Sequence, residues 1–410
     1  MAVYYINFLL ILGLAYPLCM RKPNKIKTAA YLTITFGWMW FIATFRYGIG
    51  FDYYSYIEIF EQIRGAQNLS ALWDFRYEPG FALLTWIMTF FIGDANITAN
   101  ATAMYGVYQV FILLPVVWFV YKYCKDAWLS TWLYATLTFF YISMNFTRQA
   151  LAASVSLLGY RFLCEKKPIH YFAVVLLAAS FHVSALIMVP IYFLCHIRLS
   201  KKLAIFYGSA VVFVYFTSEL ILDFVTRFVF TSYIGTTYLE WGFSFRYMFV
   251  PTLIFAACLV LLKLWERRDP DAMMLTNMMM FSFVIWLFST RHLILERFSM
   301  YPSILLMVAV PAMVSALRPS EESLSEFSAL SSASSKEAVS KRTKLAKTIK
   351  EGREFYWSAV AAVIIVTFIY HSLGINMGEY GFHNVFPYMS VFEWLGEVIP
   401  RTNIILPDIY

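Results

Sequence analysis

Long apolar runs, separated by short polar stretches, make up most of the chain. An α-helix needs about 20 apolar residues to cross a bilayer. Runs of this kind predict an all-α polytopic membrane protein with roughly 10–13 transmembrane helices, some of them re-entrant or broken. The predicted spans are 2–20, 28–45, 79–93, 101–121, 127–144, 149–164, 171–197, 203–222, 246–264, 273–290, 298–317 and 357–373.

Two of these runs have unusual lengths. The run 79–93 is short for a span, and we expect it to re-enter the membrane and return to the face from which it came. The run 171–197 is long for one span and carries Ser180, Phe181 and His182 at its middle. It predicts either two short helices that fold back at His182 or one long tilted helix.

Basic loops predict the orientation of the chain, because cytoplasmic loops of membrane proteins carry an excess of lysine and arginine. We expect all of these loops to be cytoplasmic, and the connections between them to lie outside. The basic loops are 21–27, 122–125, 166–167, 198–202, 267–268 and 318–353.

The last of these loops differs in composition from the rest of the chain. Residues 318–353 are rich in serine, end in a basic run and have too little apolar surface to order themselves. The predicted division is therefore a polytopic membrane domain, 1–317, and a Ser-rich basic cytoplasmic linker, 318–353. Residues 354–410 would supply the last transmembrane helix and an amphipathic extracytoplasmic segment.

Composition supports this class and excludes others. Of the 410 residues, 60% are hydrophobic and 14% are charged, which is far from the balance of a soluble protein. The net charge of +7 comes from residues dispersed among apolar runs, so nucleic-acid binding is not expected. The five cysteines form no CxxC pair, and the chain has none of the common nucleotide, zinc-protease or hydrolase motifs.

Polar residues on the predicted outer side need an explanation, because ionisable groups at membrane depth are costly. Each has a structural alternative: an Arg46–Asp52 pair in a glycine turn, a helix cap at Glu78, a core histidine at His182, and arginines that snorkel to the headgroups. Together, however, outward arginines fit a lipid-linked diphosphate, because a guanidinium binds phosphate oxygens bidentately. The candidates are Arg46, Asp52, Tyr53, Glu78, Arg148, Gln149, His182, Arg246, Arg291 and Arg297.

Several short motifs give the chain a resemblance to a known family. In order they are FRYGIGFDYYSY, YEPGF, NFTRQALAAS, KKPIHYF with ASFHVSALI, ERFSMY and VFPYMSVF. In this order they resemble EpsG-like membrane proteins of bacterial exopolysaccharide and capsule clusters, over roughly 1–317 and part of the C-terminal segment. The positions that match the family are Arg46, Gly50, Asp52, Tyr53, Glu78, Pro79, Arg148, Gln149, His182 and Arg297.

The resemblance implies a Wzy-like polysaccharide polymerase, broadly similar to multispan glycosyltransferases. It would be a multi-pass protein of the bacterial cytoplasmic membrane that joins undecaprenyl-diphosphate-linked oligosaccharide repeat units at the outer face. Its partners would be this lipid-linked oligosaccharide, membrane lipids and other polysaccharide assembly proteins, with no nucleic acid. The alternatives are a lipid-linked oligosaccharide flippase and a membrane O-acyltransferase.

The expected chemistry needs no nucleotide, since the donor is already activated. Preorganised arginines would stabilise the leaving diphosphate, and one carboxylate would suffice as the base. Asp52 is the first choice of base, with Glu78 and His182 as alternatives. No cofactor is expected, and a divalent cation is left open. We expect Arg46, Asp52, Glu78, Arg148, His182 and Arg297 to converge on one cavity at the outer face.

Overall fold

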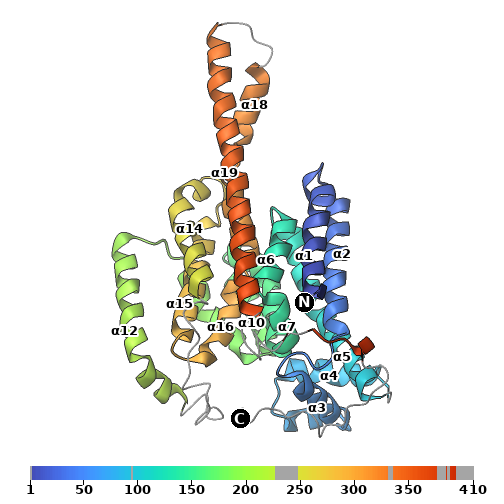
Figure 1. Ribbon diagram of the computed structural model, residues 1–410. Coiled ribbons are helices and arrows are strands. Elements are labelled where there is room, and N and C mark those ends of the chain that lie inside the picture. Colours follow the sequence, from blue (N-terminus) through green and yellow to red (C-terminus); the bar gives the residue numbers. More distant parts are fainter. Residues whose placement is uncertain are drawn as a thin grey trace.

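The computed structural model describes residues 2–93, 96–226, 248–330, 336–375, 385 and 388–393. These residues are helical apart from their connections, and an isolated bridge between Arg46 and Ser390 is their only β-type pairing (Figure 1). The predicted all-α class is thereby confirmed. The elements are α1 Ala2–Ala15, η1 Tyr16–Met20, α2 Lys25–Thr44, α3 Tyr53–Arg64, η2 Leu69–Asp74, α4 Pro79–Thr89, α5 Ile97–Tyr123, α6 Ala127–Thr136, α7 Phe139–Asn145, α8 Thr147–Ser156, η3 Leu157–Gly159, α9 Tyr160–Cys164, α10 Pro168–Ala179, η4 Val183–Ile187, α11 Met188–Cys195, α12 Lys201–Thr226, α14 Phe249–Glu266, α15 Ala272–Ser289, η7 Leu293–Leu295, α16 Glu296–Ser303, α17 Leu306–Ser315, α18 Glu321–Ala329, α19 Lys336–Ile375 and η10 Val391–Glu393.

Six of the described helices are long and apolar enough to cross a membrane. A seventh span is obtained if α16 and α17, which bend by 44° at their junction, are counted as one. The estimate of roughly 10–13 spans from the apolar runs is higher. The difference arises because several runs are divided into shorter helices, such as α6 with α7 and α10 with η4 and α11.

The core is built around these divided helices. All ten residues of α6 and all seven of α7 are buried, as are nearly all residues of α8 and α17. A helix that is apolar on every side belongs in the interior of a bundle, where neighbouring helices cover it. In contrast, only 6% of the apolar window of α12 is buried, and this helix lies at the edge of the molecule (Figure 1).

The basic loops share one end of the molecule, as their sequence predicts. Lys25, Lys122, Arg268, Arg318 and Arg353 all line one cavity at this end. Arg198 joins them there, because its guanidinium lies 3.7 Å from the carboxylate of Glu266 at the end of α14. The positive-inside rule predicts that this end is cytoplasmic, and it is called the basic end below.

Helix α4 stays at the opposite end, beside α3 (Figure 1). It has 11 residues, too few to cross a bilayer. The chain before and after α4 is held at this end, because Arg64 donates to the carbonyl of Ile92 at 3.5 Å. Within α4, the indole N–H of Trp86 donates to the carbonyl of Ala66 at 3.4 Å. The expected return of this segment to its starting face is confirmed.

The long apolar run folds back at His182, and the hypothesis of one tilted helix is wrong. Helix α10 ends at Ala179, and η4 and α11 return beside it, with the rings of Tyr171 and Tyr192 stacked at 5.0 Å between centroids. His196, just after α11, lies 2.9 Å from the carbonyl of Leu163, just before α10. Both ends of the run therefore lie at the basic end.

The segment 318–353 is more ordered than its composition predicts. It contains α18, and α19 continues from Lys336 through the last span as one helix of 40 residues. Lys341 pairs with Glu326 at 2.6 Å, which joins the two helices, and Lys347–Glu351 and Lys350–Glu354 are pairs at helical spacing. Local ion pairs and helix propensity, rather than apolar burial, account for this order. The division of the chain at 318 and 353 stays a prediction.

Candidate functional site

The glycine turn after α2 is shaped by close packing. Gly48 and Gly50 have φ angles of 62° and 96°, which side chains other than glycine rarely adopt. A Cβ atom on Gly50 would lie 2.8 Å from the carbonyl oxygen of Met144. The backbone N–H of Asp52 donates to the side-chain oxygen of Asn145 at 3.1 Å. The turn is thus fixed against the end of α7, which places Asp52 at the start of α3.

Arg46, which begins this turn, does not reach the protein surface. It is fully buried, its guanidinium donates to the carbonyls of Ala43 and Met144, and it lies 3.8 Å from the centroid of the Tyr105 ring. Tyr53 is also buried, with its ring stacked on Tyr105 at 4.9 Å. The structure therefore shows Arg46 holding the turn and does not expose its guanidinium or the ring of Tyr53 to a substrate.

Gly80, near the start of α4, lets this helix contact the fold-back at His182. Glu78 precedes α4 and Pro79 occupies its first position, where the absent N–H is not needed. The N–H of Gly80 donates to the carbonyl of Ser180 at 2.8 Å. A Cβ atom on Gly80 would overlap the side chain of Ser180 and lie 2.9 Å from its carbonyl oxygen. This contact brings Glu78 beside the start of η4.

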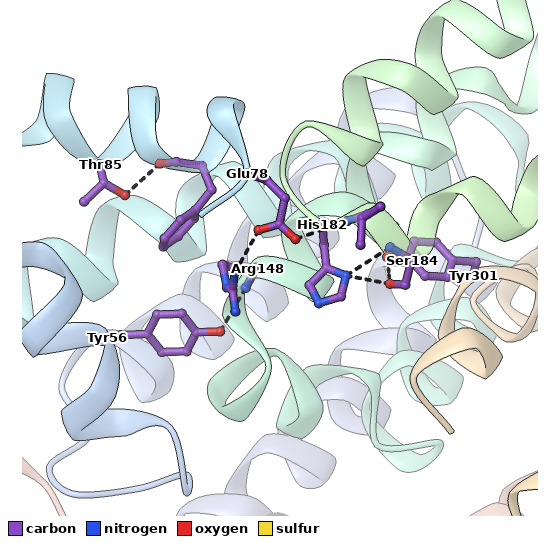
Figure 2. Close-up of polar contacts among 9 residues, drawn as sticks. Tyr56, Glu78, Thr85, Arg148, His182, Ser184 and Tyr301 are labelled. Atoms are coloured by element: carbon purple, nitrogen blue, oxygen red, sulfur yellow. Dashed lines mark hydrogen bonds and ion pairs between the residues drawn. The ribbon is translucent and has the colours of Figure 1, made fainter. Parts of the chain in front are cut away.

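Glu78 and Arg148 form the centre of the candidate site (Figure 2). Nη1 of Arg148 lies 2.7 Å from Oε2 of Glu78, with the side chains 27% and 18% exposed. The other carboxylate oxygen of Glu78 accepts the N–H of Val183 at 3.2 Å, and the hydroxyl of Tyr56 accepts the N–H of Arg148 at 3.3 Å. Four elements thus meet at this point: the segment before α4, α8, η4 and α3.

His182 completes the cluster through a chain of hydrogen bonds (Figure 2). Its Nδ1 accepts the backbone N–H of Ser184 at 3.2 Å and lies 2.6 Å from the hydroxyl of that residue. The Ser184 hydroxyl in turn lies 2.8 Å from that of Tyr301. Because Nδ1 is the acceptor of a fixed N–H, the neutral ring carries its proton on Nε2. His182 is thereby a hydrogen-bond donor through Nε2.

Burial also keeps His182 neutral. It lies in the connection between α10 and η4, outside the candidate spans. Burial lowers the pKa of His182 to about 4; the carboxylate of Glu78 opposes this shift, and the guanidinium groups of Arg148 and Arg297 add to it. The imidazole is therefore uncharged at neutral pH.

Asp52 and Arg297 lie beside this cluster. Burial raises the pKa of Tyr56 to about 12, and the carboxylate of Asp52 adds to that shift, so Asp52 is near the tyrosine that contacts Arg148. The side-chain amide of Gln149 donates to the carbonyl of Arg297. Gln149 and Arg297 also line a cavity of about 40 Å³ between the broken helices. Gln149 is buried, so in this structure it positions Arg297 at the junction of α8 and α16.

The remaining predicted residues lie elsewhere. Arg291 donates to the carbonyl of Tyr215 at 2.7 Å and pairs with Glu219, so it anchors α12 to the end of α15. Arg246 falls outside the described residues. Of the predicted residues, the structure brings together Glu78, Arg148 and His182 by direct contact or charge, with Asp52 and Arg297 adjacent.

Three contributors to the cluster were not expected from the sequence: Tyr56, Ser184 and Tyr301. Tyr301 lies in the motif ERFSMY, and Ser184 stands two positions after His182, the spacing at which a side chain can cap a turn. Nothing in the sequence indicates that these two residues meet across 117 positions. Among the described residues, no group of three His, Cys, Asp or Glu side chains is placed to hold a metal ion.

A comparison with protein-family models matches residues 29–325 to the EpsG family. The chain belongs to the EpsG family. All the cluster residues lie within this stretch, as do the candidate spans from α5 to α17, whereas the first candidate span, Ala2–Met20, precedes it. No curated protein and no solved structure gave a match in the other two comparisons.

Membership of the EpsG family implies a role in exopolysaccharide biosynthesis for this multi-pass membrane protein. The match ends within α18, so α19, which carries the last candidate span, lies outside it. The stretches FRYGIGFD, YEPGF and ASFHV, all within the matched residues, supply the glycine turn, the start of α4 and the fold-back that meet at the cluster.

Proposed function

We propose that this EpsG protein is a polysaccharide polymerase that transfers a glycan from a polyprenyl diphosphate to a lipid-linked acceptor. The observation that supports this most is the Glu78–Arg148–His182 cluster, at the end of the molecule opposite the basic loops. Under the positive-inside rule that end is the outer face. A donor that carries its own activated bond needs no nucleotide site there.

The two partly exposed arginines of the cluster suit the leaving group. Arg148 and Arg297 bear fixed positive charges, and arginine offers a planar fork of donors to phosphate oxygens. Glu78 holds one nitrogen of Arg148 and accepts a backbone N–H, so we assign it to positioning the guanidinium. Arginines fixed in this way stabilise negative charge that develops on the diphosphate.

Asp52 is the proposed base. The acceptor hydroxyl attacks the anomeric carbon of the donor sugar and forms the new glycosidic bond. Its proton passes to the carboxylate of Asp52, while the bond to the diphosphate breaks and the diphosphate leaves with the electron pair. His182, which carries its proton on Nε2, donates a hydrogen bond to an oxygen of the sugar or the diphosphate. The step is a displacement without change of oxidation state, so it needs no further reactant.

Asp52→Asn tests the base directly. It keeps size and hydrogen bonding and removes the proton acceptor, so polymer formation should fall about 100-fold or more while lipid-linked single repeats accumulate. Purified protein would be incubated with lipid-linked repeats and chain length followed on gels. The matched control is Asp74→Asn, an exposed aspartate of the same outer segment, which should polymerise normally.

Two further variants distinguish the roles. Arg148→Lys should weaken donor binding, since an ammonium group cannot replace a bidentate fork. Glu78→Gln should impair the reaction less than Asp52→Asn if Glu78 only positions Arg148. Near-normal polymer from Asp52→Asn, with a large defect in Glu78→Gln, would transfer the base role to Glu78.

A further inference from the structure

A large cavity opens at the basic end, remote from the cluster around Arg148. Its volume is about 1340 Å³. Its walls come from η1 and α2, from the α5–α6 junction, from the α14–α15 turn, and from α17, α18 and α19. Residues from both ends of the chain thus meet around one hollow.

The charge of the lining is strongly one-sided. It carries two carboxylates, Asp126 and Glu321, and one of these is already occupied: Arg318 binds both oxygens of Asp126 at 2.7 and 2.9 Å. The cationic residues of the lining are Lys25, Lys122, Lys125, Arg268, Arg318 and Arg353. A hollow lined mainly by one sign of charge concentrates its field and attracts the opposite ion.

Three of these cations are available to a ligand. Lys25, Lys122 and Arg353 are exposed, and within the part of the chain that the structure describes none of them forms an ion pair. They come from α2, α5 and α19, so their charges approach one another only in the folded protein. Lys125, in contrast, is paired with Asp269 at 3.1 Å.

Aromatic side chains place the cavity at the level of the lipid headgroups. Tyr121, Trp128 and Trp357 line it together with the cations. Tyrosine and tryptophan concentrate where the hydrocarbon meets water. Below Trp357, α19 continues as an apolar span. The cavity therefore offers positive charge at the depth where phosphate groups lie in the inner leaflet.

We propose that this cavity is a binding site for a phosphate-bearing anion at the cytoplasmic surface. Lys25, Lys122 and Arg353 contact the phosphate, and Trp128 and Trp357 border the rest of the ligand. The Arg318–Asp126 pair, to which the hydroxyl of Tyr356 also donates at 3.3 Å, holds the floor in shape. The phosphate can belong to an anionic lipid or to a soluble phosphate compound, and both present the same group to the cations.

The test compares two variants that each lose three positive charges. Lys25→Gln/Lys122→Gln/Arg353→Gln empties the cavity of its available cations. Lys201→Gln/Lys202→Gln/Arg267→Gln is the matched control, because these residues are exposed in basic loops and do not line the cavity. Thermal unfolding of purified protein is measured against increasing phosphatidylglycerol in phosphatidylcholine micelles and, separately, against inorganic pyrophosphate.

The expected result is saturable stabilisation of the wild type and of the control variant, with apparent affinity at least tenfold weaker in the cavity variant. Saturation by phosphatidylglycerol alone identifies a lipid site, and saturation by pyrophosphate identifies a soluble ligand. Equal loss of affinity in both variants would show attraction by surface charge only and overturn the proposal. The absence of saturable stabilisation in the wild type would also overturn it. Because the readout is binding, neither outcome depends on polymerase activity.

Discussion

Single glycines decide where distant segments touch. Gly80 is the clearest case, because its backbone donates to the carbonyl of Ser180 and leaves no room for a Cβ atom. Gly93, near the end of the same segment, has nothing within 4 Å of that position. Glycine is therefore required at position 80 by the close approach of Ser180, whereas position 93 has room for a larger residue.

Gly80→Ala should destabilise the protein by about 1–3 kcal/mol, because the added methyl group forces α4 and the fold-back apart. Polymer formation should fall with it, since Glu78 is carried by the same contact. Gly93→Ala should change neither property. Thermal unfolding in detergent and polymer yield would be measured for both. Equal stability of the two variants would mean that α4 does not contact Ser180 in the way described.

His182 gives stability a pH dependence whose sign follows from its burial. Its pKa is lowered from 6.5 to about 4, so the unfolded chain takes up a proton in this window that the folded protein does not. Stability conferred by His182 is present above about pH 6.5 and is lost as the pH falls towards 4. The loss should be about 2 kcal/mol between pH 7 and pH 5.

His182→Gln keeps a polar side chain and removes this titration. The decrease in melting temperature between pH 7 and pH 5 should therefore be smaller in the variant than in the wild type. Both proteins share every other titrating group, so the difference isolates one residue. An identical decrease in the two proteins would show that His182 is accessible to protons in the folded state.

Residue types were predictable at the site, but their contacts were not. Glu78, Arg148 and His182 could be selected because charge is rare in such an apolar chain. The burial of Arg46 was not predictable, since it depends on the carbonyl groups of Ala43 and Met144, which lie near the ends of α2 and α7. The sequence does not indicate whether a charged residue that follows a span is exposed to water or buried against another helix.

At the scale of elements, the return of the chain at His182 is the feature that assembles the site. It turns one apolar run into two short helices and places the connection next to Glu78. Sequence could pose the alternatives because the run is too long for one span, and polar residues interrupt its middle. The choice between them depends on packing such as that of Tyr171 on Tyr192.

Cysteine labelling tests this return. In a variant that lacks the native cysteines, Val183→Cys should react with a membrane-impermeant maleimide in intact cells, because Val183 is exposed at the outer end. Lys167→Cys and Ser200→Cys, which flank the two helices at the basic end, should react only after permeabilisation. A single crossing helix would instead place Lys167 and Ser200 on opposite sides. That pattern would remove the fold-back and with it the proposed site.

Helices α18 and α19 show the limit of inference from composition. A serine-rich, charged segment normally stays unordered because it has little to bury. Here the polar half of α19 is continuous with the apolar candidate span, so it extends an existing helix, and its ion pairs add to the stability. The apolar part of α19 already forms a helix, so the polar part does not need to start one. The composition of the polar segment alone does not show this.

At the scale of the whole molecule, two groups of cationic side chains lie apart, one around the cavity at the basic end and one near Glu78. The cations around the cavity at the basic end are many and several are exposed, whereas the cations near Glu78 are few and held by neighbours. The separation itself was predictable from sequence, because the basic loops alternate with the outer motifs along the chain. The individual contacts within each group were not, since each group draws on residues far apart in the sequence.

Helix α19 also gives the protein a visible marker. At about 1.5 Å per residue its 40 residues extend about 60 Å, twice the thickness of the hydrocarbon core. The polar half therefore stands clear of the lipid, with α18 alongside it (Figure 1). Membrane proteins without projecting domains are difficult to orient in electron micrographs, because a micelle hides their features. The projecting half of α19 would extend beyond the micelle and reveal the orientation of each molecule in single-particle images.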